Sequence, residues 1–116
     1  MVEYYLAVDI GASSGRHMLG HMENGKMVLE EVYRFANGMK KQQGKLCWDL
    51  EMLFGEIKTG IRECKKIGKI PVSMGIDTWA VDYVLLDEND RILGETWGYR
   101  DSRTEGMDQK VYEKIP

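Results

Sequence analysis

A short apolar run near the start of the chain constrains the fold more than any other feature. Residues 4–10, Tyr-Tyr-Leu-Ala-Val-Asp-Ile, are rich in β-forming side chains and are followed by Gly11. A strand with one solvated face alternates apolar and polar residues, so a near-continuous apolar run is typical of a central strand that is buried on both faces. The sequence therefore predicts an α/β domain built around this strand.

The next two strands are predicted to form an antiparallel hairpin. Residues 16–22 and 26–35 are strand-like and flank the dipeptide Asn24-Gly25. Asn-Gly is the strongest short-range hairpin signal, because both central residues of a type I′ turn need positive φ. Residues 37–45 are polar and contain two glycines, and we expect a loop there.

An amphipathic helix is predicted after this loop. Its apolar face consists of Leu50, Leu53, Phe54, Ile57, Ile61 and Cys64, which recur at helical spacing. Asp49 is a plausible N-cap, and Gly68 marks the end of the helix. Gly55 and Gly60 each cost about 1 kcal/mol relative to alanine, so we expect tertiary packing to sustain the helix.

A strand parallel to the first is predicted after the helix. Pro71 can only begin this strand, over residues 72–77, because proline lacks a donor for the ladder. The strand-helix-strand order favours a right-handed crossover, which makes the two strands parallel. Residues 81–86 and 92–97 are predicted as a second hairpin. Residues 107–116 begin like a helix and end without a cap, so we expect the amino-terminal piece of a longer protein.

This order of elements resembles the ribonuclease H-like fold, with a mixed sheet, which nucleases share with the actin, hexokinase and Hsp70 ATPase superfamily. The fold would place Asp9 and Asp77 at the ends of adjacent parallel strands, at the edge where open α/β sheets bind ligands. Two carboxylates there could hold a divalent cation directly or through water. The alternative is that each acid is only a solvated residue at a strand end.

Residues 11–16, Gly-Ala-Ser-Ser-Gly-Arg, could cradle a phosphate group. Glycine allows backbone amides to approach an anion, the serines add donors, and Arg16 offers a charged fork. The segment matches neither a Walker loop nor G-x-G-x-x-G, and a strand is expected to follow it. The phosphate would therefore be held by a hairpin turn; an ordinary turn of small residues is the alternative.

Residues 75–83, Gly-Ile-Asp-Thr-Trp-Ala-Val-Asp-Tyr, place carboxylates, a hydroxyl and aromatic rings side by side. Sugars bind through hydrogen bonds to planar polar groups and through stacking of their C–H faces on aromatic rings, so this cluster suits a carbohydrate. The alternative is that Ile76, Trp79 or Val81 enters the core while the acids face water.

Composition excludes several classes of function. The 116 residues carry 16 Lys and Arg against 19 Asp and Glu, a net charge of −3, which supplies no basic field for nucleic acid. No apolar run approaches the roughly 20 residues of a membrane span. Cys47 and Cys64 lack a C-x-x-C spacing and indicate reduced thiols in a cytoplasmic protein. His17 and His21 are about 13 Å apart along one strand, too far to share a metal.

Together these segments resemble the amino-terminal part of the FGGY carbohydrate kinases. The matching blocks are residues 8–16, 34–35, 37–38, 48–49, 75–79, 81–87 and 99–104. The Asp-Ile-Gly start is shared by the whole superfamily, whereas Ala-Ser-Ser-Gly-Arg combined with Gly-Ile-Asp-Thr-Trp and Tyr-Arg-Asp-Ser-Arg-Thr is more specific. Residues 1–116 would then form an incomplete part of the kinase N-terminal domain.

The resemblance implies ATP-dependent, Mg²⁺-assisted phosphorylation of a keto-sugar hydroxyl, L-rhamnulose to L-rhamnulose 1-phosphate. It implies ATP-phosphate contacts from Ala12, Ser13, Ser14, Gly15 and Arg16. It places Asp9 close to Mg²⁺, and Ala80 beside the sugar at a position where related kinases have glycine. Neighbouring candidates for sugar contacts are Asp77, Thr78, Trp79, Asp82 and Tyr99.

The general base of these kinases is an aspartate beyond the region covered here, so no residue of this chain inherits that role. We therefore expect the missing carboxyl-terminal part to be a partner and the chain alone to be inactive, because phosphoryl transfer needs both sides of the cleft. Three alternatives stay open: a kinase of another ketose or deoxy sugar, a metal-dependent nuclease of the same fold, and a non-catalytic sugar- or nucleotide-binding domain. The acidic composition disfavours the nuclease.

Overall fold

The chain forms two compact units. The first contains residues 1–38 and 50–80, and the second contains residues 39–49 and 81–116. The computed structural model describes residues 1–115, so Pro116, the last residue of the helix-like segment predicted over residues 107–116, lies outside the described residues. In the described part of the chain, no helix has the length and apolar character needed to cross a membrane.

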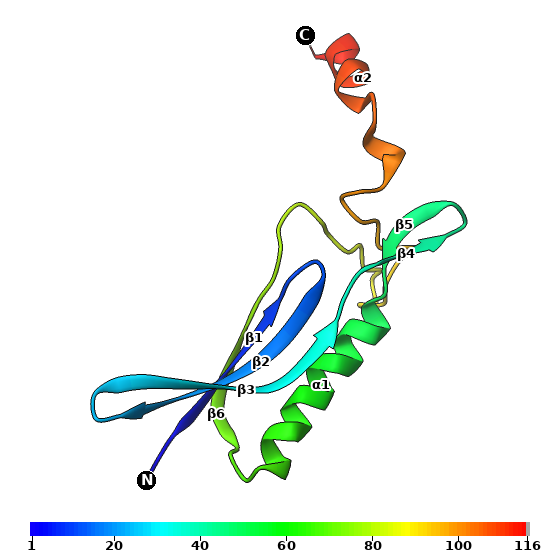
Figure 1. Ribbon diagram of the computed structural model, residues 1–116. Coiled ribbons are helices and arrows are strands. Elements are labelled where there is room, and N and C mark those ends of the chain that lie inside the picture. The colour runs from blue at the N-terminus through cyan, green and yellow to red at the C-terminus, as the bar shows by residue number, and fades with distance from the viewer. Residues whose placement is uncertain (116) are drawn as a thin grey trace. The chain divides into compact units, whose positions relative to one another are not determined.

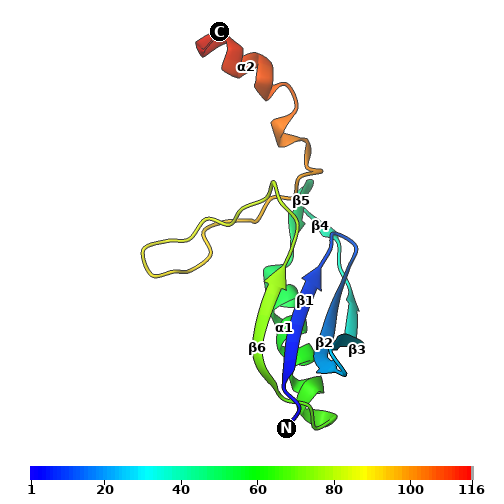
Figure 2. The same cartoon turned by 90° about the vertical axis from the view of Figure 1, so that its left-hand side faces the viewer.

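The first unit is built on a four-stranded mixed sheet (Figures 1 and 2). Its strands are β1 (Tyr4–Ile10), β2 (Ser14–Glu23), β3 (Lys26–Ala36) and β6 (Pro71–Asp77). The order across the sheet is β3-β2-β1-β6, with β1 antiparallel to β2 and parallel to β6. The predicted central strand and its parallel neighbour after the helix are therefore confirmed.

The β2–β3 hairpin turns at Asn24 and Gly25, as the sequence predicts. Their φ angles are 52° and 77°, which is the left-handed conformation required in a two-residue hairpin turn. The two strands extend slightly beyond the predicted ranges and pair from Glu23 opposite Lys26 to Ser14 opposite Ala36.

Helix α1 (Leu50–Lys66) covers one face of this sheet. The hydrophobic core of this unit contains the buried side chains of Leu6, Val8, Ile10, Leu19, Phe35, Leu53 and Cys64. Gly68 adopts a φ of 72° just after the helix, which confirms the predicted stop. The prediction for Phe54 is wrong: 61% of this residue is exposed, and the Lys58 ammonium lies 4.7 Å from the centre of its ring.

The two helix glycines differ in their surroundings. An added Cβ at Gly60 would overlap the imidazole ring of His17, which is completely buried beneath α1 and donates from Nε2 to the Ile57 carbonyl (3.0 Å). Glycine at position 60 therefore lets α1 approach β2 closely. Gly55 has no atom within 4 Å of the equivalent position, so the structure gives no packing reason for it.

The second unit contains a short hairpin that the sequence did not predict. Strands β4 (Met39–Gln42) and β5 (Lys45–Trp48) pair antiparallel where we expected a loop over residues 37–45. Gln43 and Gly44 have φ angles of 50° and 79°, so the turn has the same left-handed pair as an Asn-Gly turn. The prediction was wrong because the segment Lys-Lys-Gln-Gln has no apolar alternation to mark a strand.

The predicted hairpin of residues 81–86 and 92–97 forms only in part. No strand is present there among the described residues; Leu86 and Ile92 make an isolated bridge, and the Leu93 amide donates to the Leu85 carbonyl (2.8 Å). The chain continues through a 3-10 helix, η1 (Ser102–Thr104), into helix α2 (Met107–Lys114).

Candidate active-site edge

Asp9 and Asp77 lie side by side at the carboxyl ends of β1 and β6. They are direct register partners in the parallel pair. The neighbouring β1 residues Val8 and Ile10 are buried beneath α1, so Asp9 belongs to the opposite face of the sheet, which we call the uncovered face. Register partners share a face, so Asp77 belongs to it too. The expected pair of carboxylates at one sheet edge is confirmed.

Arg16 faces Asp9 from the other neighbouring strand. The two residues are register partners in the β1–β2 pair, and Arg16 Nε lies 3.7 Å from Asp9 Oδ2. Arg16 Nε is buried and has no hydrogen-bond partner within the described residues. A buried donor without a partner is uncommon and costs free energy, so this guanidinium is suited to receive an additional anion.

Hydrogen bonds within the turn and from Asn37 hold the turn between β1 and β2 in place. The Gly11 amide donates to the Ser14 carbonyl (2.8 Å), and Asn37 Nδ2 donates to the Gly11 carbonyl (2.8 Å). The Asn37 amide also donates to the Ser13 carbonyl (3.0 Å). Within residues 1–115, the amides of Ala12 and Ser13 take part in none of these bonds, so they are free to donate to a ligand. The sequence indicated Asn37 only as part of a matching block and gave no sign of this positioning role.

Gly15 is required for packing. An added Cβ would overlap the ring of Phe35, and Gly15 is buried on the face of the sheet that α1 covers. The absence of a side chain at Gly15 therefore makes room for Phe35, whereas the sequence argument had linked it to the approach of an anion. Ser14 and Arg16 alternate with Gly15 and belong to the uncovered face.

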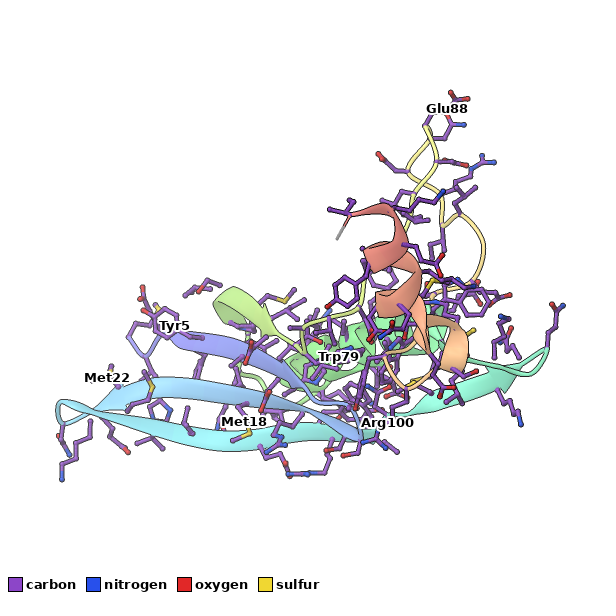
Figure 3. The ribbon with its side chains drawn as sticks, turned by 90° about the horizontal axis from the view of Figure 1, so that it is seen from above. Tyr5, Met18, Met22, Trp79, Glu88 and Arg100 are labelled. Atoms are coloured by element: carbon purple, nitrogen blue, oxygen red, sulfur yellow. The ribbon has the colours of Figure 1, made fainter. Side chains whose placement is uncertain are left out.

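The segment Thr78-Trp79-Ala80 leaves the sheet directly after Asp77, at the edge from which the turn after β1 also starts. Trp79 is half-buried and packs against the core, near the end of the sheet opposite Tyr5 and Met22 (Figure 3). Thr78 and Ala80 are exposed.

For residues 75–83, the alternative was that Ile76, Trp79 or Val81 enters the core, and this is only partly confirmed. Trp79 contacts the core through part of its surface. Ile76 and Val81 do not enter it, because they are 50% and 79% exposed.

Asp82 and Tyr99 belong to the second unit, where both lie next to Trp48. Trp48 Nε1 donates to Asp82 Oδ2 (2.6 Å), and the rings of Trp48 and Tyr99 have centroids 6.4 Å apart. Trp48 is only 5% exposed, so its indole positions Asp82, whereas Tyr99 is 41% exposed and its ring can stack on a sugar. The sequence analysis placed Trp48 in a matching block but did not single it out as a site residue.

Asp101 ties the segment after Tyr99 to β5. Its carboxylate accepts from the Leu46 amide (2.8 Å) and from the Arg103 amide (3.0 Å). These backbone donors, with Leu46 contributing most, lower the pKa of Asp101 below its usual value. The Asp101 carboxylate therefore serves the local structure of the second unit.

The described residues contain no group of three or more His, Cys, Asp or Glu side chains placed to hold a metal ion. Asp9 and Asp77 offer two carboxylates at one edge. Mg²⁺ usually takes one or two carboxylates and completes its octahedron with water and substrate phosphate oxygens, so two acids fit that ion, whereas a cage made only of protein ligands is not formed.

Comparison with known proteins decides the family. The FGGY family of carbohydrate kinases, N-terminal domain, matches residues 4–115. The chain belongs to this family. It is 53% identical over 114 residues to a rhamnulokinase of Halalkalibacterium halodurans, covering 98% of this chain and 24% of that protein. It is 48% identical over 107 residues to a rhamnulokinase of Bacillus subtilis, covering 92% of this chain and 22% of that protein.

Solved FGGY kinases share the fold. A gluconate kinase from Lactobacillus acidophilus superposes with a TM-score of 0.78 at 16% identity, covering 98% of this chain and 23% of that one. A xylulose kinase from the same organism gives 0.75 at 16% identity, covering 97% and 23%. The predicted kinase-type fold is thereby confirmed. The chain spans about a quarter of the length of the curated relatives it matches.

Proposed function

We propose that this chain is the amino-terminal part of a cytoplasmic, ATP-dependent carbohydrate kinase that converts L-rhamnulose to L-rhamnulose 1-phosphate. The observation that carries the proposal is the parallel pairing of β1 and β6, which gives the turn after Ile10 and the segment after Asp77 a common edge. About half of the residues are identical to those of proteins named rhamnulokinase, which supports this ketose as the substrate.

The nucleotide phosphates would bind at the turn between β1 and β2. The amides of Ala12 and Ser13 and the hydroxyl of Ser14 supply donors that a phosphate oxygen can use. Gly15 contributes its backbone, and Arg16 brings a guanidinium whose Nε has no partner within the described residues. Asn37 holds this turn in place and is a positioning residue.

A Mg²⁺ ion bound with ATP would neutralise charge that develops on the transferred phosphoryl group. In this chain, Asp9 is the carboxylate proposed to lie next to that ion, directly or through water. The side chain of Asp9 is 51% exposed and its contact with Arg16 is longer than a hydrogen bond, so it can accept new partners without breaking a tight ion pair.

Candidate sugar contacts are proposed within each unit. In the first, Asp77, Thr78, Trp79 and Ala80 supply a carboxylate, a hydroxyl, an indole face and a small side chain. In the second, Asp82 and Tyr99 are grouped with Trp48. Ala80 stands where the family resemblance implies glycine, and its methyl group narrows the space beside the sugar. A kinase of another ketose is therefore the second candidate function.

The general base is proposed to lie in the carboxyl-terminal part of the whole kinase. The 116-residue chain would then bind parts of both substrates but catalyse no transfer, because in-line displacement needs both substrates to be placed across a complete cleft.

The experiment is a coupled assay of ATP consumption with L-rhamnulose, L-fuculose, L-ribulose and D-xylulose. We expect the full-length kinase to consume ATP with L-rhamnulose at the highest kcat/KM, and the 116-residue chain to show no turnover. Highest activity with a different ketose would establish the second candidate. Sugar-dependent ATP consumption by the chain alone would refute the assignment of the base to the remainder of the protein.

A further inference from the structure

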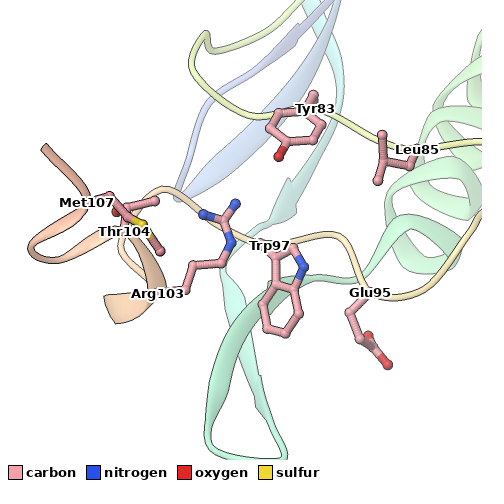
Figure 4. A pocket seen from close by; sticks show the side chains of 7 residues that line it. All are labelled: Tyr83, Leu85, Glu95, Trp97, Arg103, Thr104 and Met107. Atoms are coloured by element: carbon pink, nitrogen blue, oxygen red, sulfur yellow. The ribbon is translucent and has the colours of Figure 1, made fainter. Parts of the chain in front are cut away.

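The second unit contains a cavity that none of the proposed kinase contacts uses. It has a volume of about 360 Å³ and is lined by Tyr83, Leu85, Glu95, Trp97, Arg103, Thr104 and Met107 (Figure 4). Small-molecule sites in proteins begin at about 300 Å³ and combine aromatic walls with a few polar groups, so both the size and the lining fit a small ligand.

Arg103 is the charged group at the centre of this cavity. Its guanidinium carbon lies 5.7 Å from the centre of the Trp97 ring, and Figure 4 shows the guanidinium projecting between Trp97 and Tyr83. Arg103 is half-buried, and no carboxylate within the described residues lies within ion-pair distance of it. Arg103 acts on the Asp101 carboxylate from a distance and helps to lower its pKa, but a guanidinium held on an aromatic face without an ion pair keeps its donors available for an anion.

The charges around the cavity favour an anion. The Lys45 ammonium lies 5.1 Å from the centre of the Trp97 ring, so this ring carries two cations. Asp101 is 7% exposed, and its carboxylate oxygens already accept from two backbone amides. Glu95 lines the cavity, but Figure 4 shows its carboxylate pointing away from Arg103.

The other walls define the rest of the ligand. Leu85 and Met107 are apolar, and Tyr83 and Thr104 each carry a hydroxyl that can donate to an anion. We propose that this cavity binds a small organic anion, with a carboxylate or phosphate group on Arg103 and a compact apolar or aromatic body against Trp97 and Leu85. The lining of this cavity shares no residue with the proposed ATP and sugar contacts, and the inference does not depend on the proposed function.

The test uses the 116-residue chain and two probes, phenyl phosphate and benzoate, at constant ionic strength. The signal is the NMR resonance of the Trp97 indole N–H, assigned by its loss in Trp97→Phe. We expect a saturable shift with at least one probe, which tells which anionic group the site prefers. Arg103→Gln should weaken binding about tenfold or more, because a hydrogen bond to a charged group is removed.

Arg100→Gln is the matched control. Arg100 lies three residues earlier and carries the same charge, but it is exposed and stacks on Tyr99, 5.4 Å from the centre of that ring. Affinity in this variant should stay within about twofold of the original. A shift that does not saturate, or equal weakening by Arg100→Gln and Arg103→Gln, would overturn the proposal.

Arg103→Lys provides a second variant in case Arg103→Gln disturbs the fold. It keeps the charge and the aliphatic stem but loses the planar fork, so we expect weaker binding with an unchanged pattern of backbone resonances. Unchanged affinity in this variant would contradict the role of the guanidinium.

Discussion

Asp9 and Asp77 lie directly opposite one another on adjacent parallel strands, although helix α1 and four strands separate them in the sequence. Arg16 completes the row from the other side, with Nε 3.7 Å from Asp9 Oδ2. An edge with two acids beside one guanidinium can interact with both a cation and the phosphate groups that accompany it. This row is where the proposed function assigns the nucleotide phosphates and their cation.

We expect the same substitution at Gly55 and Gly60 of α1 to have opposite effects on the free energy of unfolding. Gly60→Ala should lower the free energy of unfolding by about 1–3 kcal/mol, because the new methyl group would overlap the buried ring of His17. Gly55→Ala meets no atom within 4 Å and should raise it by up to about 1 kcal/mol through helix propensity. Urea unfolding of both variants checks this pair; equal effects would contradict the close approach of α1 to β2.

Because His17 is buried, we expect the free energy of unfolding to fall in mild acid. Burial lowers the pKa of His17 below its ordinary value of 6.5, against smaller opposing effects of the Ile57 carbonyl and Glu56. The unfolded chain therefore binds a proton at His17 more readily than the folded chain does. The contribution of neutral His17 to the free energy of unfolding is complete above pH 6.5, and it is lost as the pH falls through the pKa of the folded state.

The measurement for His17 is an NMR titration from neutral pH down to about pH 5, combined with urea unfolding at each pH. We expect the His17 ring to stay neutral at pH values where a histidine with the ordinary pKa of 6.5 is already protonated. Protonation of the His17 ring at the ordinary pKa of 6.5, with no loss of stability in acid, would show that His17 is not buried as described.

We expect substitution of Asn37 to affect the use of nucleotide more than it affects folding. Asn37→Ala removes the hydrogen bond from Nδ2 to the Gly11 carbonyl, at a cost of about 1 kcal/mol in stability. In the full-length kinase, the loosened turn should raise KM for MgATP severalfold and leave KM for the sugar unchanged. Steady-state kinetics with each substrate varied in turn distinguish this result from a general loss of activity.

We expect substitution of Trp48 to change KM for the sugar and not KM for MgATP. Trp48→Phe keeps an aromatic ring beside Tyr99 but removes the Nε1 donor to Asp82. In the full-length kinase, KM for the sugar should rise about tenfold while KM for MgATP stays the same. An increase confined to MgATP would place Trp48 and Asp82 with the nucleotide instead.

The regular elements of the first unit could be predicted because their signals are local. The apolar run of β1, the Asn24-Gly25 turn and the spacing of apolar residues in α1 each reflect a rule that acts within a few residues. The parallel pairing of β1 and β6 followed from the handedness of strand-helix-strand connections.

The features that were missed depend on contacts between distant residues. The β4–β5 hairpin is polar, and its partners come from far along the chain: the Trp48 amide donates to the Thr96 carbonyl (2.8 Å). Phe54 fits the apolar period of α1, yet it lies outside the contact with the sheet. The roles of Asn37 and Trp48 likewise arise from hydrogen bonds to Gly11 and Asp82, which spacing alone does not indicate.

The sheet edge itself is tested most directly by Asp9→Asn in the full-length kinase, with Glu31→Gln as the matched control. Glu31 is a carboxylate of β3 paired with Arg34 (2.6 Å), and it takes no part in the proposed site. Both substitutions should change the free energy of unfolding by no more than about 0.5 kcal/mol. Asp9→Asn should lower kcat/KM for MgATP about 100-fold, and Glu31→Gln should leave it unchanged. Equal kcat/KM for MgATP in Asp9→Asn and the original kinase would contradict the assignment of this edge to the nucleotide.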